Sequence, residues 1–198
     1  KCNELANRLS GLRKKGAKKL AHEIEQNLHS LGMKAASMEI LIEDSGALQQ
    51  FGKDKISFMI AANKGEKFSE IQNSSSGGEL SRLMLALKVA LKGKGDIETL
   101  LFDEIDSGIG GTVANNVALE LLKLSKMQQV VAITHLAQIA SKADRHFVVF
   151  KEEKNGRTIS HIKEIKGEER VKEIARLLSG DTSEISLEHA RSLLEVQN

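Results

Sequence analysis

The spacing of apolar residues predicts a long helix over residues 1–31, followed by two strands. The apolar positions of the first segment recur in steps of three and four. They are Leu5, Leu9, Leu12, Leu20, Ile24, Leu28 and Leu31. Gly32 is a plausible end for this helix, because glycine tolerates the left-handed backbone found there. Alternating apolar residues at 38–42 and 56–60 then predict half-buried strands, and a polar loop covers about 62–75.

The rest of the chain alternates helical patterns with short apolar runs. Helices are expected at about 79–92, 112–126, 168–178 and 183–196, with a short one after residue 135. Continuous apolar runs at 100–102, 130–133 and 147–150 are typical of strands buried on both faces. Strands of this kind separated by helices indicate a parallel sheet with right-handed crossovers. The segment Lys154-Asn155-Gly156-Arg157 looks like a hairpin turn leading into a further strand near 158–164.

Composition excludes some classes of protein but does not choose a function. The 198 residues carry a net charge of +2, so bulk charge does not argue for nucleic acid binding. The chain lacks Trp and Tyr, which weakens any case for base stacking. A lone cysteine, Cys2, excludes an internal disulfide framework and fits a reducing cytosol. No apolar run approaches the roughly 20 residues that span a bilayer, so no membrane partner is expected.

One basic cluster and the start of the chain add two expectations. Five of the seven residues from Arg13 to Lys19 are basic. They form either a solvated helix face or a patch that contacts phosphates near the base of a coiled coil. The chain begins with Lys1 and a polar stretch, without a signal peptide. We therefore expect a fragment whose upstream part has been removed.

The first candidate site is the start of the helix that follows the polar loop. Gly77 and Gly78 leave backbone N–H groups uncovered, and a helix N-terminus adds partial positive charge. Together with the Ser76 hydroxyl they form a socket suited to a terminal phosphate. Ser76 and Glu79 also have the spacing of a capping box, which is a purely structural alternative.

The second candidate is the acidic pair Asp103 and Glu104 at the end of an apolar run. Ligands of parallel α/β sheets bind at the carboxyl ends of the strands. An acidic residue there can hold Mg²⁺, directly or through water, and the next carboxylate can orient or deprotonate an attacking water. An acidic helix-capping turn is the structural alternative.

The third candidate is His135, which follows the next apolar run. It can hydrogen-bond a phosphate oxygen, although a lone histidine after a strand is more often structural. The five other histidines show no metal-ligand spacing. The order of the signals carries more weight than each alone. A Ser-Gly-Gly-Glu helix start, an apolar strand ending in Asp-Glu, Asp106 two residues on, and a strand ending in histidine resemble the C-terminal lobe of ATP-binding-cassette ATPases.

Longer segments resemble the RecN family of bacterial DNA-repair proteins, which are SMC-like members of this superfamily. Residues 75–88 resemble its signature motif, residues 99–111 its Walker B motif and D-loop, and residues 134–140 its switch-histidine segment. Residues 61–66 and 167–176 also fit, so the resemblance covers most of 30–195. Lys64 and Ala137 stand where the family has proline. No phosphate loop of the form G-x-x-x-x-G-K-[ST] occurs.

The resemblance implies an α/β fold that forms the C-terminal lobe of a P-loop ATPase head, at residues 32–198. Residues 1–31 would be the end of a coiled-coil helix, and the phosphate loop would lie in an N-terminal lobe of the same protein. Such heads dimerise around two ATP molecules, hold DNA at breaks, and act in the cytoplasm at the nucleoid as part of the SOS response. The fragment alone is expected to be inactive.

Roles carry over residue by residue. Asp103 would bind Mg²⁺, Glu104 would be the general base, and His135 would contact the γ-phosphate. Asp106 would form the D-loop contact across the dimer. The segment Ser76, Gly77, Gly78 and Glu79 would touch the γ-phosphate of ATP bound to the opposite head. Two alternatives stay open: another SMC-like or ATP-binding-cassette ATPase, and a non-hydrolytic module for dimerisation or DNA tethering.

Overall fold

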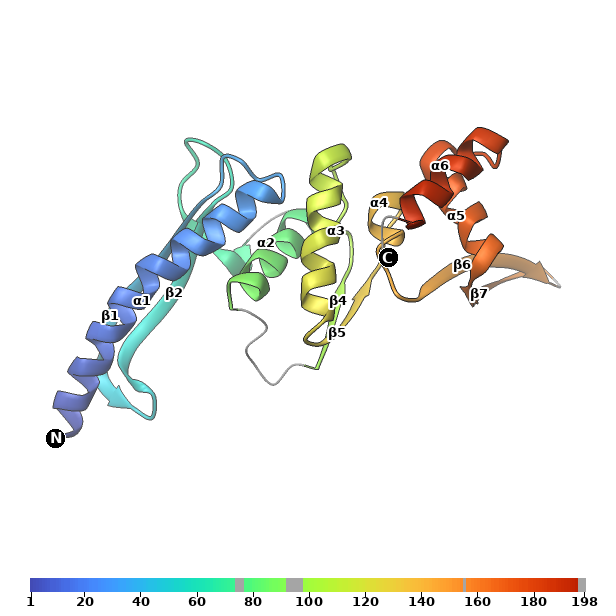
Figure 1. The fold of residues 1–198 in the computed structure, drawn as a ribbon. Coiled ribbons are helices and arrows are strands. Elements are labelled where there is room, and N and C mark those ends of the chain that lie inside the picture. The colour runs from blue at the N-terminus through green and yellow to red at the C-terminus, as the bar shows by residue number, and fades with distance from the viewer. Residues whose placement is uncertain (74–76, 92–97, 155, 196–198) are drawn as a thin grey trace.

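The chain forms an elongated arrangement of helices and three small sheets. A computed structural model describes residues 1–73, 77–91, 98–154 and 156–195. Helix α1 and the first sheet lie at one end, and α2, α3 and the strands β4 and β5 lie in the middle (Figure 1). The β6–β7 pair and the helices α5 and α6 lie at the other end. The candidate site residues belong to the middle part.

Helix α1 (Cys2–Ser30) runs alongside the first sheet, and its C-terminal half enters the core (Figure 1). Ile24, Leu28 and Leu31 are fully buried in the main hydrophobic cluster. The helix stops where predicted, because Gly32 has a φ of +91°. A side chain there would also come within 2.8 Å of Val113 on α3, so glycine is required for both conformation and space.

The first sheet is antiparallel and covers α1. It consists of β1 (Ser37–Gln49), β2 (Gly52–Ala61) and β3 (Ser69–Glu70), followed by the 3₁₀ turn η1 (Ile71–Asn73). Met38 and Ile60 are direct cross-strand partners, and both are buried against the α1 side of the core. The two strands predicted at 38–42 and 56–60 are confirmed, although both are longer than the pattern showed.

The middle part is a strand–helix–strand unit preceded by a helix. Its elements are α2 (Gly77–Ala90), β4 (Thr99–Phe102), α3 (Gly111–Ser125) and β5 (Gln129–Ala132). Strands β4 and β5 are parallel, with Leu100 opposite Val130 and Phe102 opposite Ala132. Leu100 and Phe102 are buried, whereas Leu101 on the opposite face of β4 is 66% exposed. This sheet is therefore covered on one face only.

The C-terminal part builds a second, smaller core. The short helix α4 (Ala137–Ala140) packs against α5 (Gly167–Ser179), and α5 packs against α6 (Glu184–Glu195). Ala140, Ile174, Ala175 and Ala190 are buried between them. Strands β6 (His146–Lys154) and β7 (Arg157–Ile165) form an antiparallel hairpin that leaves Val149 and Ile162 exposed.

The α/β class is confirmed, but the parallel part of the sheet is smaller than the predicted "mainly parallel" sheet. Among the described residues, only β4 and β5 pair in parallel. The run 147–150, expected as a doubly buried strand, belongs to β6 and pairs with β7, in the hairpin that the turn at 154–157 predicted. Lys154 and Arg157 are cross-strand partners, so the connection is far too short for the crossover that parallel strands need, and strands joined by such a turn must be antiparallel.

A polar cluster fastens α1 to the turn between β1 and β2. The carboxylate of Asp54 accepts hydrogen bonds from the Ser10 hydroxyl and from Arg13 Nη1 at 2.8 Å. Arg13 Nη2 also donates to the Phe51 carbonyl at 2.7 Å. The Asp54 side chain is only 3% exposed. The hydrogen bond from Ser10, and then that from Arg13, lowers the pKa of Asp54.

We predict that Asp54 makes the fold sensitive to acid. Because the pKa is lower in the folded chain, the ionised carboxyl stabilises the folded state above the unfolded pKa of about 3.9, and that contribution is lost as pH falls toward the folded value. The Asp54→Asn variant should therefore be less stable than wild type at neutral pH, and its free energy of unfolding should fall less below about pH 4. Denaturant unfolding at several pH values measures both effects.

The matched control is Asp44→Asn, since the Asp44 carboxylate binds Lys53 at 2.7 Å but is 57% exposed. Its effect should be much smaller, because exposed ion pairs contribute little. If Asp54→Asn has the same acid dependence as wild type, Asp54 does not couple the fold to pH.

Candidate functional site

The acidic pair lies directly after β4, at the carboxyl end of the strand. Asp103 and Glu104 are both exposed, and the Glu104 N–H donates to Asp103 Oδ1 at 2.9 Å. Glu104 has a φ of +54° and is the one described non-glycine residue with positive φ. This conformation costs an L-residue about 1–2 kcal/mol, and such strain clusters at functional sites. The positive φ at Glu104 turns the backbone sharply between β4 and the residues after Glu104.

The N-terminal turns of α2 pack against the segment from Asp103 to Ser107, which we call the acidic loop. A Cβ on Gly77 would overlap the Glu104 carboxylate. A Cβ on Gly78 would lie 2.7 Å from Ser107 Cβ and 3.0 Å from the Glu104 carbonyl oxygen. Gly78 is therefore needed for the close approach of helix and loop, whereas at Gly77 the end of the flexible Glu104 side chain could move away.

Two polar side chains on α2 reinforce this contact. The Ser81 hydroxyl donates to the Asp103 carbonyl at 2.6 Å. Arg82 Nη1 donates to the Ser107 carbonyl at 2.8 Å and to the Ile105 carbonyl at 3.4 Å. Desolvation by burial lowers the pKa of Arg82, and the charge of Glu79 opposes this shift. Helix α2 thus holds the acidic loop through backbone carbonyls and leaves the two carboxylates exposed.

Asp106 joins the acidic loop to the segment around His135. It is 4% exposed, and its Oδ2 accepts hydrogen bonds from the Thr134 hydroxyl at 2.5 Å and from the His135 N–H at 2.8 Å. His135 Nδ1 lies 3.0 Å from the same oxygen, although the imidazole is 72% exposed. This contact favours the proton on Nδ1, which leaves Nε2 as the acceptor of a neutral ring.

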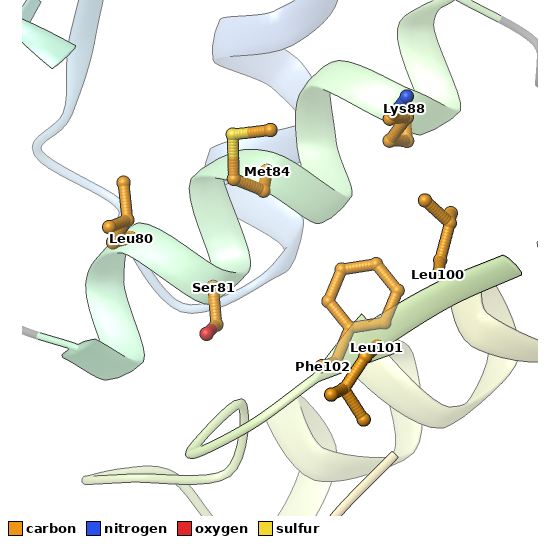
Figure 2. Close-up of a pocket in the computed structure, with 7 residues that line it drawn as sticks. All are labelled: Leu80, Ser81, Met84, Lys88, Leu100, Leu101 and Phe102. Carbon is orange, nitrogen blue, oxygen red and sulfur yellow. The ribbon is translucent and has the colours of Figure 1, made fainter. Parts of the chain in front are cut away.

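An apolar pocket lies beside the site, between α2 and β4. It is lined by Leu80, Ser81, Met84, Lys88, Leu100, Leu101 and Phe102 (Figure 2). Met84 is 37% exposed and Leu101 is 66% exposed. The pocket has one hydroxyl and one ammonium group but no carboxylate among its lining residues, so the acidic chemistry lies next to it and not within it.

The described residues alone do not form a metal centre. No group of three or more His, Cys, Asp or Glu side chains in the described part of the chain could hold an ion. Mg²⁺ takes six oxygen ligands and commonly keeps several waters while binding one or two carboxylates and substrate phosphates. An exposed Asp103 fits that mode of binding, in which most ligands come from water and nucleotide.

Curated relatives identify the family. The DNA repair protein RecN of Deinococcus radiodurans is 42% identical over 186 residues, which cover 94% of this chain and 33% of that protein. RecN of Treponema pallidum is 46% identical over 178 residues, covering 86% of this chain and 31% of that protein. The chain belongs to the RecN family. It spans about a third of the length of the curated RecN relatives it matches. No family model matches the chain.

Solved structures show that this RecN segment has the fold of an SMC head. The Smc head domain of Pyrococcus furiosus, with an extended coiled coil, matches with a TM-score of 0.53 and 19% identity, covering 82% of this chain and 38% of that one. The Smc head domain of Pyrococcus yayanosii, with a coiled coil and joint, also matches with a TM-score of 0.53 and 19% identity. The match covers 93% of this chain and 30% of that one. Identities this low support the fold alone.

The structure brings together most of the residues predicted from the sequence. Gly77, Gly78 and Glu79 begin α2, and Asp103, Glu104 and Asp106 lie in the acidic loop against it. His135 is bonded to Asp106. Ser76 lies outside the described residues. The catalytic and binding roles given to these residues stay predictions.

Sequence reasoning missed the residues that connect these segments. Ser81, Arg82 and Thr134 make the hydrogen bonds between α2, the acidic loop and the His135 segment. A serine and an arginine on a helix resemble any solvated face. The signal that could have found Arg82 is its place among Leu83, Leu85 and Ala86, which are buried.

We predict that Gly78→Ala separates α2 from the acidic loop, whereas Gly77→Ala does not. At position 78 the new methyl meets Ser107 Cβ and the backbone oxygen of Glu104, which cannot move freely. Overpacking of this kind costs about 1–3 kcal/mol. At position 77 it meets only the end of the flexible Glu104 side chain. Denaturant unfolding of both variants measures the difference, and equal stabilities would contradict the close approach at Gly78.

Proposed function

We propose that this chain is the C-terminal half of a RecN-type ATPase head, which binds and hydrolyses ATP between dimerised heads during recombinational repair of DNA double-strand breaks. The observation that carries the proposal is the convergence of three segments at one edge of β4–β5. The glycine-rich start of α2, the acidic pair after β4 and the histidine after β5 are joined by direct contacts. These are part of the groups that phosphoryl transfer to water requires, and the phosphate loop is not among them.

Asp103 is proposed as the Mg²⁺ ligand and Glu104 as the general base. Both carboxylates are exposed at the end of a strand, where a nucleotide could reach them. Mg²⁺ would neutralise charge on the β- and γ-phosphates. Glu104 would accept a proton from the attacking water, and its backbone, turned by the positive φ, holds the carboxylate beyond Asp103. His135 would contact the γ-phosphate as a doubly protonated ring, in which Nδ1 donates to Asp106 and Nε2 donates to the phosphate.

The same contacts support a site shared between two heads. Gly77 lies so close to the Glu104 carboxylate that even a methyl group would not fit between them. With the side chain in this conformation, the negative carboxylate occupies the space beside Gly77 of the same chain and would repel a phosphate there. We therefore propose that Ser76, Gly77, Gly78 and Glu79 contact the γ-phosphate of ATP held by the opposite head, with Asp106 in the D-loop between them.

The exposed apolar faces support a missing N-terminal lobe. The outer face of the parallel pair exposes Leu101, Val131 and Ile133, and the β6–β7 hairpin exposes Val149 and Ile162. Apolar sheet faces of this kind are normally covered. We propose that a lobe carrying the phosphate loop covers them in the full-length protein. Residues 1–31 would continue into a coiled coil, although their C-terminal half already belongs to the core.

DNA is the proposed partner of the assembled heads, at ends or single-stranded regions of breaks. Within the basic run on α1, Arg13 is engaged with Asp54. Lys14, Lys15 and Lys18 are thus the better candidates for phosphate contacts.

The proposed location is the cytoplasm, at the nucleoid, in the SOS response. Among the described residues no helix has both the length and the apolar character needed to cross a bilayer.

The central test is ATP turnover by the full-length protein, with and without DNA, for wild type and Glu104→Gln. Removing the base should lower kcat by ~100-fold or more, with ATP binding retained. Glu153→Gln, an exposed residue on β6, is the matched control and should turn over ATP like wild type. If Glu104→Gln hydrolyses ATP at the wild-type rate, Glu104 is not the base.

A non-hydrolytic tether is the alternative from a different class. It predicts that the wild-type protein binds ATP and dimerises without turnover. The exposed Glu104, held in a strained conformation next to Asp103, favours hydrolysis, because a tether has no use for a base at that position. The isolated chain, lacking a phosphate loop, should bind ATP weakly under either reading, as equilibrium dialysis can measure.

A further inference from the structure

Arg82 is a buried cation that the proposed chemistry does not use. Its side chain comes from the second turn of α2, and the residue is 7% exposed. Its Nε has no hydrogen-bond partner in the described part of the chain. Burying a guanidinium is costly, and an apolar side chain of similar size is often as good or better for stability. Packing alone therefore does not account for an arginine at this position.

The partners of Arg82 indicate a more specific role. Its Nη1 donates to the carbonyls of Ile105 and Ser107, which lie on either side of Asp106. Asp106 in turn accepts hydrogen bonds from the Thr134 hydroxyl and the His135 N–H. Arg82 thus begins a continuous series of polar contacts that runs from the signature helix through the acidic loop to the histidine segment.

Glu104 lies within the stretch that Arg82 fixes. The Ser107 N–H donates to the Glu104 carbonyl at 3.0 Å, which closes a turn over residues 104–107. That carbonyl also packs against Gly78. With the Ser107 carbonyl held by Arg82 and the Asp103 carbonyl held by Ser81, the turn is fixed to α2 at both ends. The position of the Glu104 carboxylate therefore depends on the position of α2.

We propose that Arg82 is a positioning residue that makes the acidic loop and the N-terminal turns of α2 move as one body. The inference rests on the proposed function for its consequence. When the signature segment of a head contacts ATP on the opposite head, α2 would carry that head's own Glu104 and Asp106 with it. Through Arg82, the contact of α2 with one ATP would therefore change the position of the general base, Glu104, at the other ATP site.

The test uses the full-length protein with Arg82→Met, which keeps the bulk of the side chain and removes its donors. Because small displacements of a reacting group are costly, kcat should fall ~10- to 100-fold. The KM for ATP should change by no more than about twofold, since Arg82 does not touch the nucleotide. Arg82→Lys retains charge and a donor and should recover part of the lost kcat.

Arg170→Met is the matched control. Arg170 is also a partly buried arginine on a helix, with Nη2 donating to the carbonyls of Ser141 and Ala143 and with Nε lacking a partner in the described structure. It lies away from the acidic loop. Its replacement should lower the melting temperature and leave kcat within about twofold of wild type. If Arg170→Met reduces kcat as much as Arg82→Met, the effect of Arg82 is only structural and the proposal is wrong.

Hydrogen–deuterium exchange gives a readout that does not need activity. In Arg82→Met the amides of residues 104–109 should exchange faster than in wild type, while those of α3 keep their protection. Unchanged protection at 104–109 would overturn the proposal whatever the turnover. Conversely, a wild-type protein without turnover would contradict the proposed ATPase function, and the exchange result would still decide the role of Arg82.

Discussion

The site depends on one close contact, between the N-terminal turns of α2 and the acidic loop after β4. Gly78 permits the approach, and Ser81 and Arg82 hold the loop through three backbone carbonyls. Because the loop is bound through its backbone, its exposed carboxylates at 103 and 104 stay available for a metal ion and water. This arrangement lowers the stability of the fold, because Glu104 has a strained φ and the Arg82 guanidinium is buried. The packing of α2 on α1 and α3 stabilises the fold in the opposite direction.

The structure also describes a chain that completes only part of its core. Leu100 and Phe102 are buried against the helices, but Leu101 between them is exposed, because a strand presents alternate residues to opposite faces. Val149 and its cross-strand partner Ile162 on the β6–β7 hairpin are exposed as well. These faces account for the pattern that predicted doubly buried strands. Under the proposal of a covering lobe, the sequence pattern reflects burial in the full-length protein, and this chain spans about a third of its curated relatives.

Periodicity was sufficient for the elements and insufficient for their partners. The leucine stripe and Gly32 predicted α1 and its end. The Ser-Gly-Gly-Glu, Asp-Glu and histidine signals picked out segments that lie in contact in the structure. The hairpin turn at 154–157 predicted the pairing of β6 with β7, but the place given to 147–150 in a parallel sheet was wrong, since an apolar run does not specify a parallel or an antiparallel neighbour. Arg82 and Thr134 were missed because their partners are a backbone carbonyl and a buried carboxylate, contacts between distant segments that leave no pattern in the sequence.

The central claim, a site shared between two heads, is tested most directly by mixing two inactive full-length variants. Ser76→Asp places a negative charge where the signature segment would meet a phosphate, and Glu104→Gln removes the base. In a mixed dimer, one site would combine the intact Glu104 of the first subunit with the intact Ser76 of the second. The account predicts that mixing restores ATP turnover in proportion to the mixed dimers formed. If dimers form and turnover stays absent, each site is built within one head and the account is wrong.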